Sequence, residues 1–339
     1  MKKYWLGILF LILVIAVFWF GFPKIFNIKK QDNLYHAKIT IAMETWTGYF
    51  PLIVARDKGY FKEAGLDVEI KRYEALGELS KDYIAGKMQA RANLTLDAVN
   101  EYLNGVDHKV ILAIDYSNGS DAIMAGNDIK TVKDFQGKRV GYEPNTLEEF
   151  FLVWALQEDS MKINDIIAVS SGPSETPKLL MDGTIDVAVS HEPFISQLSS
   201  SGNFHVVFSS AEAPGLITDI LTFRTDFINA HPETVQTIAN IYFKALKFWK
   251  DNPQEANAMV AKEFGDTSEG IAKQLKGITM LDERDNRTAF TFAVGLQSLY
   301  GNMRQIGKFV LKHTEKDLPN RNLDIDQLIV SDYIQNISQ

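Results

Sequence analysis

The repeated alternation of short strand patterns with helix patterns after residue 36 limits the fold of this chain more than any other feature. In "AKITIAME" apolar residues alternate with smaller or polar ones, which predicts a strand. "PLIVARDKG" predicts a helix with a proline in its first turn and an end at Gly59, and "LDVEIKRY" predicts a second strand. Strands joined in this way run parallel, and ligands of such sheets bind beyond the carboxyl ends of the strands.

The same alternation continues to about residue 224. Further strands are predicted in "ARANLT", "HKVILAI", "KRVGY", "IIAVS", "TIDVAVS" and "FHVVFS", with helices between most of them. "DAIMA" predicts a strand that could leave a first lobe, and "DILTFR" predicts one that returns to it. Beyond these, helices are predicted over Pro232–Lys250, Pro253–Phe264, Ser268–Lys276 and Thr288–Ile306.

This order of elements predicts an α/β fold with two doubly wound lobes joined by a hinge, the second lobe being inserted into the first. We expect the first lobe to comprise residues 36–124 and, after the chain returns, residues 219–339 with the C-terminal helices. The second lobe is expected to comprise residues 125–218.

Residues 1–30 are predicted to be a membrane anchor or a signal segment. Twenty uncharged, mostly apolar residues lie between Lys3 and Lys24, and as a helix they would be about 30 Å long, enough to cross a bilayer. No small-x-small cleavage site follows, so an uncleaved N-terminal transmembrane helix is favoured. A cleaved signal peptide and a buried core helix stay open as alternatives.

Charge and cysteine content exclude several functions. Removing the five lysines of residues 1–30, which contain no acid, takes the net charge from −8 to −13, and an acidic body argues against nucleic acid. The absence of cysteine excludes disulfides, thiolate metal sites, a cysteine nucleophile and a lipidated N-terminal cysteine. The six histidines lack metal-ligand spacing, and no hydrolase, phosphate-loop or metalloprotease motif is present. We therefore expect no catalytic residues, no metal and no cofactor.

The segment "TWTGYFPLIVARDKGYFKEAGLDVEI" resembles the opening of periplasmic solute-binding proteins for nitrate, taurine, aliphatic sulphonates and thiamine-pyrimidine precursors. "DFQGKRVGYEPNT", "GTIDVAVSHEPF" and "HPETVQTIANIYFKALKFWKDNPQEA" match that group in the same order. The resemblance implies a type II periplasmic binding protein, located outside the cytoplasm, that delivers a small molecule to the permease of an ABC transporter. A monomer is expected. A ligand-sensing receptor and an enzyme acting on a pyrimidine precursor are the alternatives, although the cysteine-rich motif of the related enzymes is absent.

The stretch "ETWTGYFP" is the strongest candidate for a ligand contact. Trp46 and Tyr49 offer flat walls with polar tips, and Thr47 can cap the following helix or donate to a ligand. Gly48 is expected to permit a tight bend, and Glu44 adds a carboxylate at the end of the strand. Core filling is the alternative interpretation.

Two further polar groups follow predicted strands. In "NLTLD", Thr95 and Asp97 are candidate ligand contacts, although both residue types also cap helices. In "DYSNGSD", Ser117, Asn118 and Asp121 are candidates near the passage between lobes, although the stretch is also a favourable turn sequence.

The remaining candidates belong to the second lobe and to the returning strand. Asn145 and Thr146 precede a helix, where Thr146 and Glu149 also predict a capping box. Glu192 in "SHEPF" is a candidate acceptor, and Asp219 could act similarly or mark the hinge.

The acids around these positions predict the chemistry of the ligand. No lysine or arginine is among the candidate residues. The acids are Glu44, Asp97, Asp115, Asp121, Glu143, Glu192 and Asp219. Burying an unpaired carboxylate is costly, so the ligand must supply N–H donors or positive charge. An amine, an aminopyrimidine or a zwitterion such as taurine fits this expectation, whereas nitrate or a simple sulphonate fits poorly.

Overall fold

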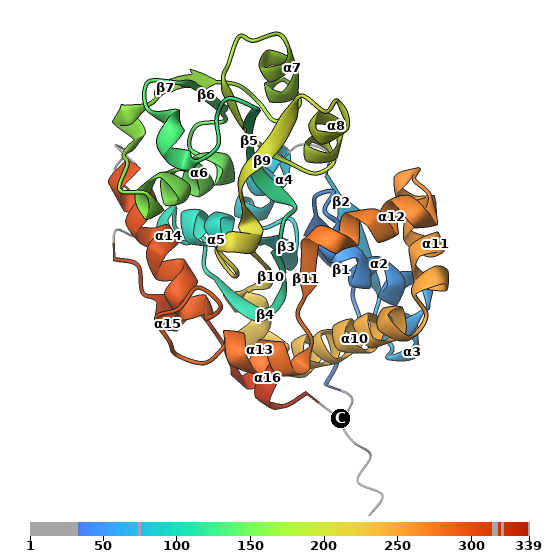
Figure 1. The fold of residues 1–339 in the computed structure, drawn as a ribbon. Coiled ribbons are helices and arrows are strands. Elements are labelled where there is room, and N and C mark those ends of the chain that lie inside the picture. The colour runs from blue at the N-terminus through green and yellow to red at the C-terminus, as the bar shows by residue number, and fades with distance from the viewer. Residues whose placement is uncertain (1–32, 74–75, 314–317, 320–321, 338–339) are drawn as a thin grey trace, which may run out of the picture. The chain divides into compact units, whose positions relative to one another are not determined.

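Two β-sheets organise the chain in a computed structural model that describes residues 33–73, 76–313, 318–319 and 322–337 (Figure 1). Residues 36–339 belong to one unit. The expected anchor, residues 1–30, lies outside the described residues. Within the described ranges, no helix combines the length and apolarity needed to cross a membrane.

The first sheet has six strands in the order β11-β4-β10-β3-β1-β2. Their bounds are β1 Ile39–Met43, β2 Val68–Arg72, β3 Ala90–Leu94, β4 His108–Ser117, β10 Thr218–Arg224 and β11 Ile278–Met280. Strand β1 pairs in parallel with β2 and β3, whereas β10 runs antiparallel to β3 and β4. The connecting helices are α2 Phe50–Asp57, α3 Tyr60–Glu63, α4 Leu76–Ile84 and α5 Thr95–Leu103. The predicted strand–helix–strand opening is confirmed.

The second sheet has five strands in the order β7-β6-β8-β5-β9. Their bounds are β5 Asp121–Gly126, β6 Arg139–Tyr142, β7 Ile167–Ser170, β8 Val187–His191 and β9 Phe204–Ser209. Strand β6 is parallel to β7 and β8, and β5 is antiparallel to β8 and β9. Its longer helices are α6 Leu147–Glu158, α7 Thr176–Met181 and α8 Phe194–Ser200.

The chain passes from the first sheet to the second between β4 and β5, and it returns between β9 and β10. Strand β5 lies whole in the second sheet, so the expected division between residues 124 and 125 falls inside a strand of that sheet. One serine joins the two crossing segments, because the Ser210 hydroxyl lies 2.7 Å from the Ser117 hydroxyl and accepts a hydrogen bond from Gly119 N at 2.7 Å. The lobe boundaries themselves stay a prediction.

The C-terminal part is mostly helical, as expected, apart from the short strand β11 and one wrongly predicted helix. Its helices are α9 Thr225–Ala230, α10 Pro232–Asp251, α11 Pro253–Phe264, α12 Ser268–Gln274, α13 Glu283–Ala289, α14 Leu299–His313, α15 Ile325–Leu328 and α16 Asp332–Gln335. The single helix predicted over Thr288–Ile306 is wrong, because α13 ends at Ala289 and a loop precedes α14. In that loop the Ser298 hydroxyl donates to the Thr291 carbonyl at 2.7 Å, which fixes a turn where a helix was expected.

Helices α10 and α11 pack against α2, the helix that begins within "ETWTGYFP" at Phe50 (Figure 1). At the start of α2, the Phe50 ring stacks on Phe264 with ring centroids 4.8 Å apart and lies 5.9 Å from Trp249. Phe50 is 2% exposed, so the carboxyl end of β1 is anchored by aromatic packing on its C-terminal side. This packing holds the candidate ligand segment in place.

Candidate ligand-binding site

Gly48 lets the candidate segment approach the first sheet closely. A Cβ atom at this position would lie 1.7 Å from Asp115 Oδ2 and 2.7 Å from Trp46 Nε1. Its backbone does not have a positive φ. The chain turns tightly here, in a 3-10 turn at Thr47–Tyr49, and the glycine has a further reason: only a residue without a side chain leaves room for the Asp115 carboxylate.

The two aromatic residues of the segment hold two carboxyl groups of the sheet. The Trp46 indole N–H lies 3.3 Å from both carboxylate oxygens of Asp115, and the Tyr49 hydroxyl donates to Asp219 Oδ1. Asp115 and Asp219 are opposite each other in the register of β4 and β10. The polar tips of the predicted aromatic wall thus point to a pair of facing acids.

Burial of these acids perturbs their ionisation. Burial raises the pKa of Asp115 to about 8, against the hydrogen bond from Trp46, and raises the pKa of Glu44 to about 7. The pKa of Asp219 rises well above its usual range through burial and the nearby charge of Asp115, and burial also raises the pKa of Asp121. An added positive charge would favour the ionised forms of all four groups.

An inner cavity of about 150 Å³ brings five predicted residues together. It is lined by Glu44, Trp46, Tyr49, Asp121 and Asp219, joined by His191 and others. One carboxylate oxygen of Asp121 and one of Asp219 are buried, with no hydrogen-bond partner among the described residues. A buried carboxylate oxygen that has lost its hydrogen bonds to water requires another donor to offset that loss.

A second, outer cavity of about 510 Å³ adjoins the inner one. The two share Thr45, Trp46 and His191, and the outer one also includes Thr47 and Glu192. The Thr47 hydroxyl donates to Gln274 Oε1 at 2.6 Å. Arg72 also lines the outer cavity, so the expected absence of arginine from the site is corrected.

Two predicted contacts on α5 lie outside both cavities. Asp97 accepts a hydrogen bond from Arg91 at 3.1 Å, and Arg91 also donates to Glu101. Thr95 is 1% exposed. Neither Thr95 nor Asp97 is among the residues that line the two cavities.

Two predicted contacts lie at the crossing segments. Ser117 is bonded to Ser210, and the Asn118 amide donates to the Thr279 hydroxyl at 3.1 Å. These bonds join elements of the first sheet and the return crossing. Asp121, four residues after Ser117, is the member of this group that lines the inner cavity.

The candidates of the second lobe make local hydrogen bonds. Thr146 caps α6 by accepting from Glu148 N at 3.2 Å, while the Glu149 carboxylate accepts from Asn145 N at 2.7 Å. The predicted capping box is therefore displaced by one residue, because Glu149 reaches Asn145 and not Thr146. Glu192 accepts from the backbone N–H and hydroxyl of Ser196 at 3.1 and 2.8 Å.

Comparison with known proteins identifies the family. The family described as NMT1/THI5 like matches residues 46–256, more than half of the chain. The chain belongs to the NMT1/THI5-like family. A taurine-binding periplasmic protein of Escherichia coli is 23% identical over 268 residues, which cover 75% of this chain and 81% of that protein. The bicarbonate-binding protein CmpA of Synechococcus elongatus is 23% identical over 239 residues, which cover 61% of this chain and 52% of that protein.

In relatives from Brucella abortus, which are 24% identical, the match spans 66% of their length, just under two thirds. Among solved structures, the periplasmic aliphatic sulphonate binding protein SsuA from Escherichia coli has a TM-score of 0.72 at 14% identity. That alignment covers 88% of this chain and 99% of SsuA. The predicted family resemblance and the two-sheet α/β fold of periplasmic binding proteins are confirmed.

Among the residues that line both cavities of the candidate site, sequence reasoning missed Thr45 and His191. Both line the inner and the outer cavity. His191 is opposite Asp121 in the register of β8 and β5, and its positive charge would lower the pKa of Asp121, which burial raises. The position of His191 at the carboxyl end of a strand is the sequence signal for its place in the cavity wall. The search for metal-ligand spacing could not detect it.

Proposed function

We propose that this NMT1/THI5-like chain is an extracytoplasmic solute-binding protein that captures a small polar, nitrogen-bearing molecule for import by an ABC transporter. The observation that carries the proposal is the pair of buried, unpartnered carboxylate oxygens on Asp121 and Asp219 in the inner cavity. A ligand that brings N–H donors or positive charge satisfies both atoms, and an anion satisfies neither.

Both sheets contribute residues to the inner cavity. Glu44, Trp46 and Asp219 come from the first sheet or its loops, and Asp121 and His191 come from the second. Movement of the lobes towards each other brings acceptors from both sides onto one ligand and removes water from between them. Charge-assisted hydrogen bonds strengthen as water is excluded, so ligand binding and closure reinforce each other.

The partner and the location follow from the same proposal. The permease of the transporter would receive the closed, loaded protein, and the N-terminal segment would keep the chain at the membrane outside the cytoplasm. We expect a monomer that returns its ligand chemically unchanged.

The acid-lined cavity sets this chain apart from what the names of its relatives indicate. Bicarbonate and sulphonates are anions, and taurine is a zwitterion that also carries an ammonium group. The three carboxyl groups that line the inner cavity repel a free anion when they are ionised, whereas an ammonium, amidinium or aminopyrimidine group favours their ionised forms and can donate to them. We therefore infer that the ligand places a nitrogen group in the inner cavity.

Mass spectrometry of small molecules released from purified protein tests the proposal. A thermal-shift panel of amines, aminopyrimidines, taurine, sulphonates and nitrate follows, since ligand at 100 times its Kd adds about 2.7 kcal/mol of stability. Asp219→Asn should weaken binding of an active amine about tenfold or more, whereas Asp128→Asn, at an exposed acid of β5's following turn, should not. Stabilisation by nitrate or sulphonates alone would exclude this ligand class.

A further inference from the structure

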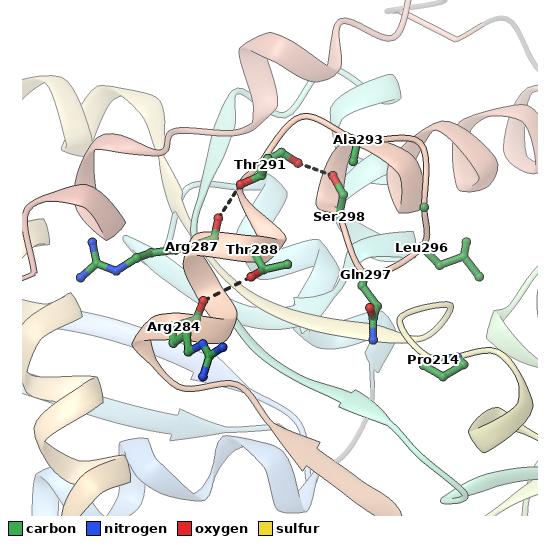
Figure 2. A pocket seen from close by; sticks show the side chains of 10 residues that line it. Pro214, Arg284, Arg287, Thr288, Thr291, Ala293, Leu296, Gln297 and Ser298 are labelled. Atoms are coloured by element: carbon green, nitrogen blue, oxygen red, sulfur yellow. Dashed lines mark hydrogen bonds between the residues drawn. The ribbon is translucent and has the colours of Figure 1, made fainter.

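A groove of about 760 Å³ lies apart from the two cavities of the candidate site. Its walls come from the return crossing at Pro214, from Arg284 and Arg287 on α13, and from the loop of residues 291–298 (Figure 2). None of the predicted ligand contacts lines it. The groove is therefore a separate feature of the first-sheet half.

The return crossing connects this groove to the ligand site. Pro214 lines the groove, and Ile217, three residues later, lines the inner cavity. Between them Gly215 has a φ of +84°, and a Cβ there would lie 2.6 Å from the Leu296 carbonyl oxygen. The Asn302 amide donates to the carbonyls of Gly215 and Leu216, both at 2.8 Å. A molecule in the groove would contact the segment Pro214–Ile217, whose backbone is packed against Leu296 and hydrogen-bonded to Asn302.

The chemistry of the groove is cationic and partly apolar. Arg284 and Arg287 are exposed, and no ion pair of either is found among the described residues. The hydroxyls of Thr288 and Thr291 already donate to backbone carbonyls on α13, at 3.4 and 2.8 Å (Figure 2). The two guanidinium groups therefore supply the strongest donors along this wall.

The loop beside them exposes apolar side chains. Val294 is 83% exposed and Phe292 is 64% exposed. The Phe292 ring contacts Tyr300, with ring centroids 5.2 Å apart, and the Arg304 guanidinium, which lies 4.5 Å from the Phe292 centroid. Exposed apolar residues next to unpaired arginines are typical of a protein-binding surface.

We propose that this groove binds an acidic, partly apolar segment of a partner protein and thereby acts on the return crossing. Arg284 and Arg287 point in different directions in Figure 2, so a single compact anion would not engage both, whereas a segment with two separated carboxylates would. The net charge of −8 disfavours a nucleic acid. Contact through Pro214 would change the geometry of the inner cavity at Ile217, so partner binding and ligand binding are coupled.

The absence of cysteine allows a clean binding experiment. A dye is attached to Gln297→Cys in the groove, and the full chain is titrated with a short peptide of alternating glutamate and leucine. We expect saturable binding that weakens as salt rises, and about a tenfold loss of affinity in Arg284→Ala/Arg287→Ala. Lys62→Ala/Lys130→Ala removes the same charge at exposed positions elsewhere and should bind as the parent does.

Several outcomes would overturn the proposal. They are no saturable binding, equal binding of a peptide with lysine in place of glutamate, an equal loss in the lysine variant, or an affinity independent of salt. The salt dependence of the parent decides the matter even if the arginine variant does not fold. A second dye at Thr45→Cys, on the rim of the ligand site, should respond to the peptide, and an unchanged signal there would exclude the coupling.

Discussion

Two groups of buried acids, one on β3 and α5 and the other on β4, β5 and β10, differ in whether a buried arginine lies among them. In the first group Arg91, fully buried on β3, bonds to both Asp97 and Glu101. Burial raises the pKa of Glu101, and the Arg91 guanidinium opposes that rise. Arg91 Nε and Glu101 Oε2 are buried without a hydrogen-bond partner among the described residues, but the group contains its own counter-ion.

The second group, on β4, β5 and β10, contains Asp115, Asp121 and Asp219, and its bonds come from Trp46 and Tyr49. No lysine or arginine is among the described residues that line the inner cavity. An acid group with its own arginine supports the fold, and one that lacks a lysine or arginine is suited to a cationic ligand. Four substitutions test this difference, from the largest expected effect to the smallest.

Arg91→Met should have the largest effect, because it leaves Asp97 and Glu101 buried without a counter-ion. We expect a loss of about 3–5 kcal/mol in the free energy of unfolding, measured by chemical denaturation. The control is Arg139→Met, which breaks a half-exposed pair with Asp186 at 2.7 Å and should cost about 1 kcal/mol or less. Equal losses would show that the Arg91 group has no special structural role.

Gly48→Ala should come next, because its Cβ would collide with the Asp115 carboxylate. We expect a loss of about 1–3 kcal/mol in stability together with a loss of ligand binding. Gly77→Ala, where a Cβ meets nothing within 4 Å, is the control and should not destabilise the protein. Normal ligand binding by Gly48→Ala would contradict the close approach of Asp115.

Asp115→Asn should stabilise the ligand-free protein at pH 8. With a pKa near 3.8 when unfolded and about 8 when folded, Asp115 keeps its proton longer in the folded state. Its contribution to stability is therefore lost as the pH rises from about 4 to about 8. The substitution removes this dependence, and we expect a gain on the order of 1–2 kcal/mol at pH 8 and little change near pH 4. If the difference in free energy of unfolding between the parent and Asp115→Asn is the same at pH 4 and at pH 8, this explanation is wrong.

His191→Gln should have the smallest effect. Loss of the positive charge opposite Asp121 removes an influence that lowers the pKa of Asp121, so that acid would ionise at higher pH. We expect the pH at which amine binding is half-maximal to move upward, as measured by thermal shift across a pH series. The affinity at pH 8 should change less than about tenfold. His205→Gln, on β9 and outside both cavities, is the control.

The parts of the site that depend on local patterns were predictable, and those that depend on distant contacts were not. The positions of Trp46 and Tyr49 follow from a strand, a short turn and a helix that are adjacent in the sequence. The pairing of Asp97 with Arg91 was missed because Arg91 lies within a strand, where the alternating pattern predicts an ordinary polar position. The role of Gly48 depends on Asp115, which lies 67 residues later.

The loop after α13 shows the same limit. Residues 288–306 favour a helix locally, but the contact of Gly215 with Leu296 and the bonds of Asn302 require a turn there. Those partners are some 80 residues apart in the chain. Tertiary contacts outweighed a modest local preference.

The Ser210 hydroxyl has a mechanical consequence. Ser210 lies on the returning segment, and its hydroxyl is bonded to Ser117 and Gly119 of the outgoing one, so the two segments are tied to each other at this point. A rotation of one half against the other must therefore carry both segments together, since moving either one alone breaks these two hydrogen bonds.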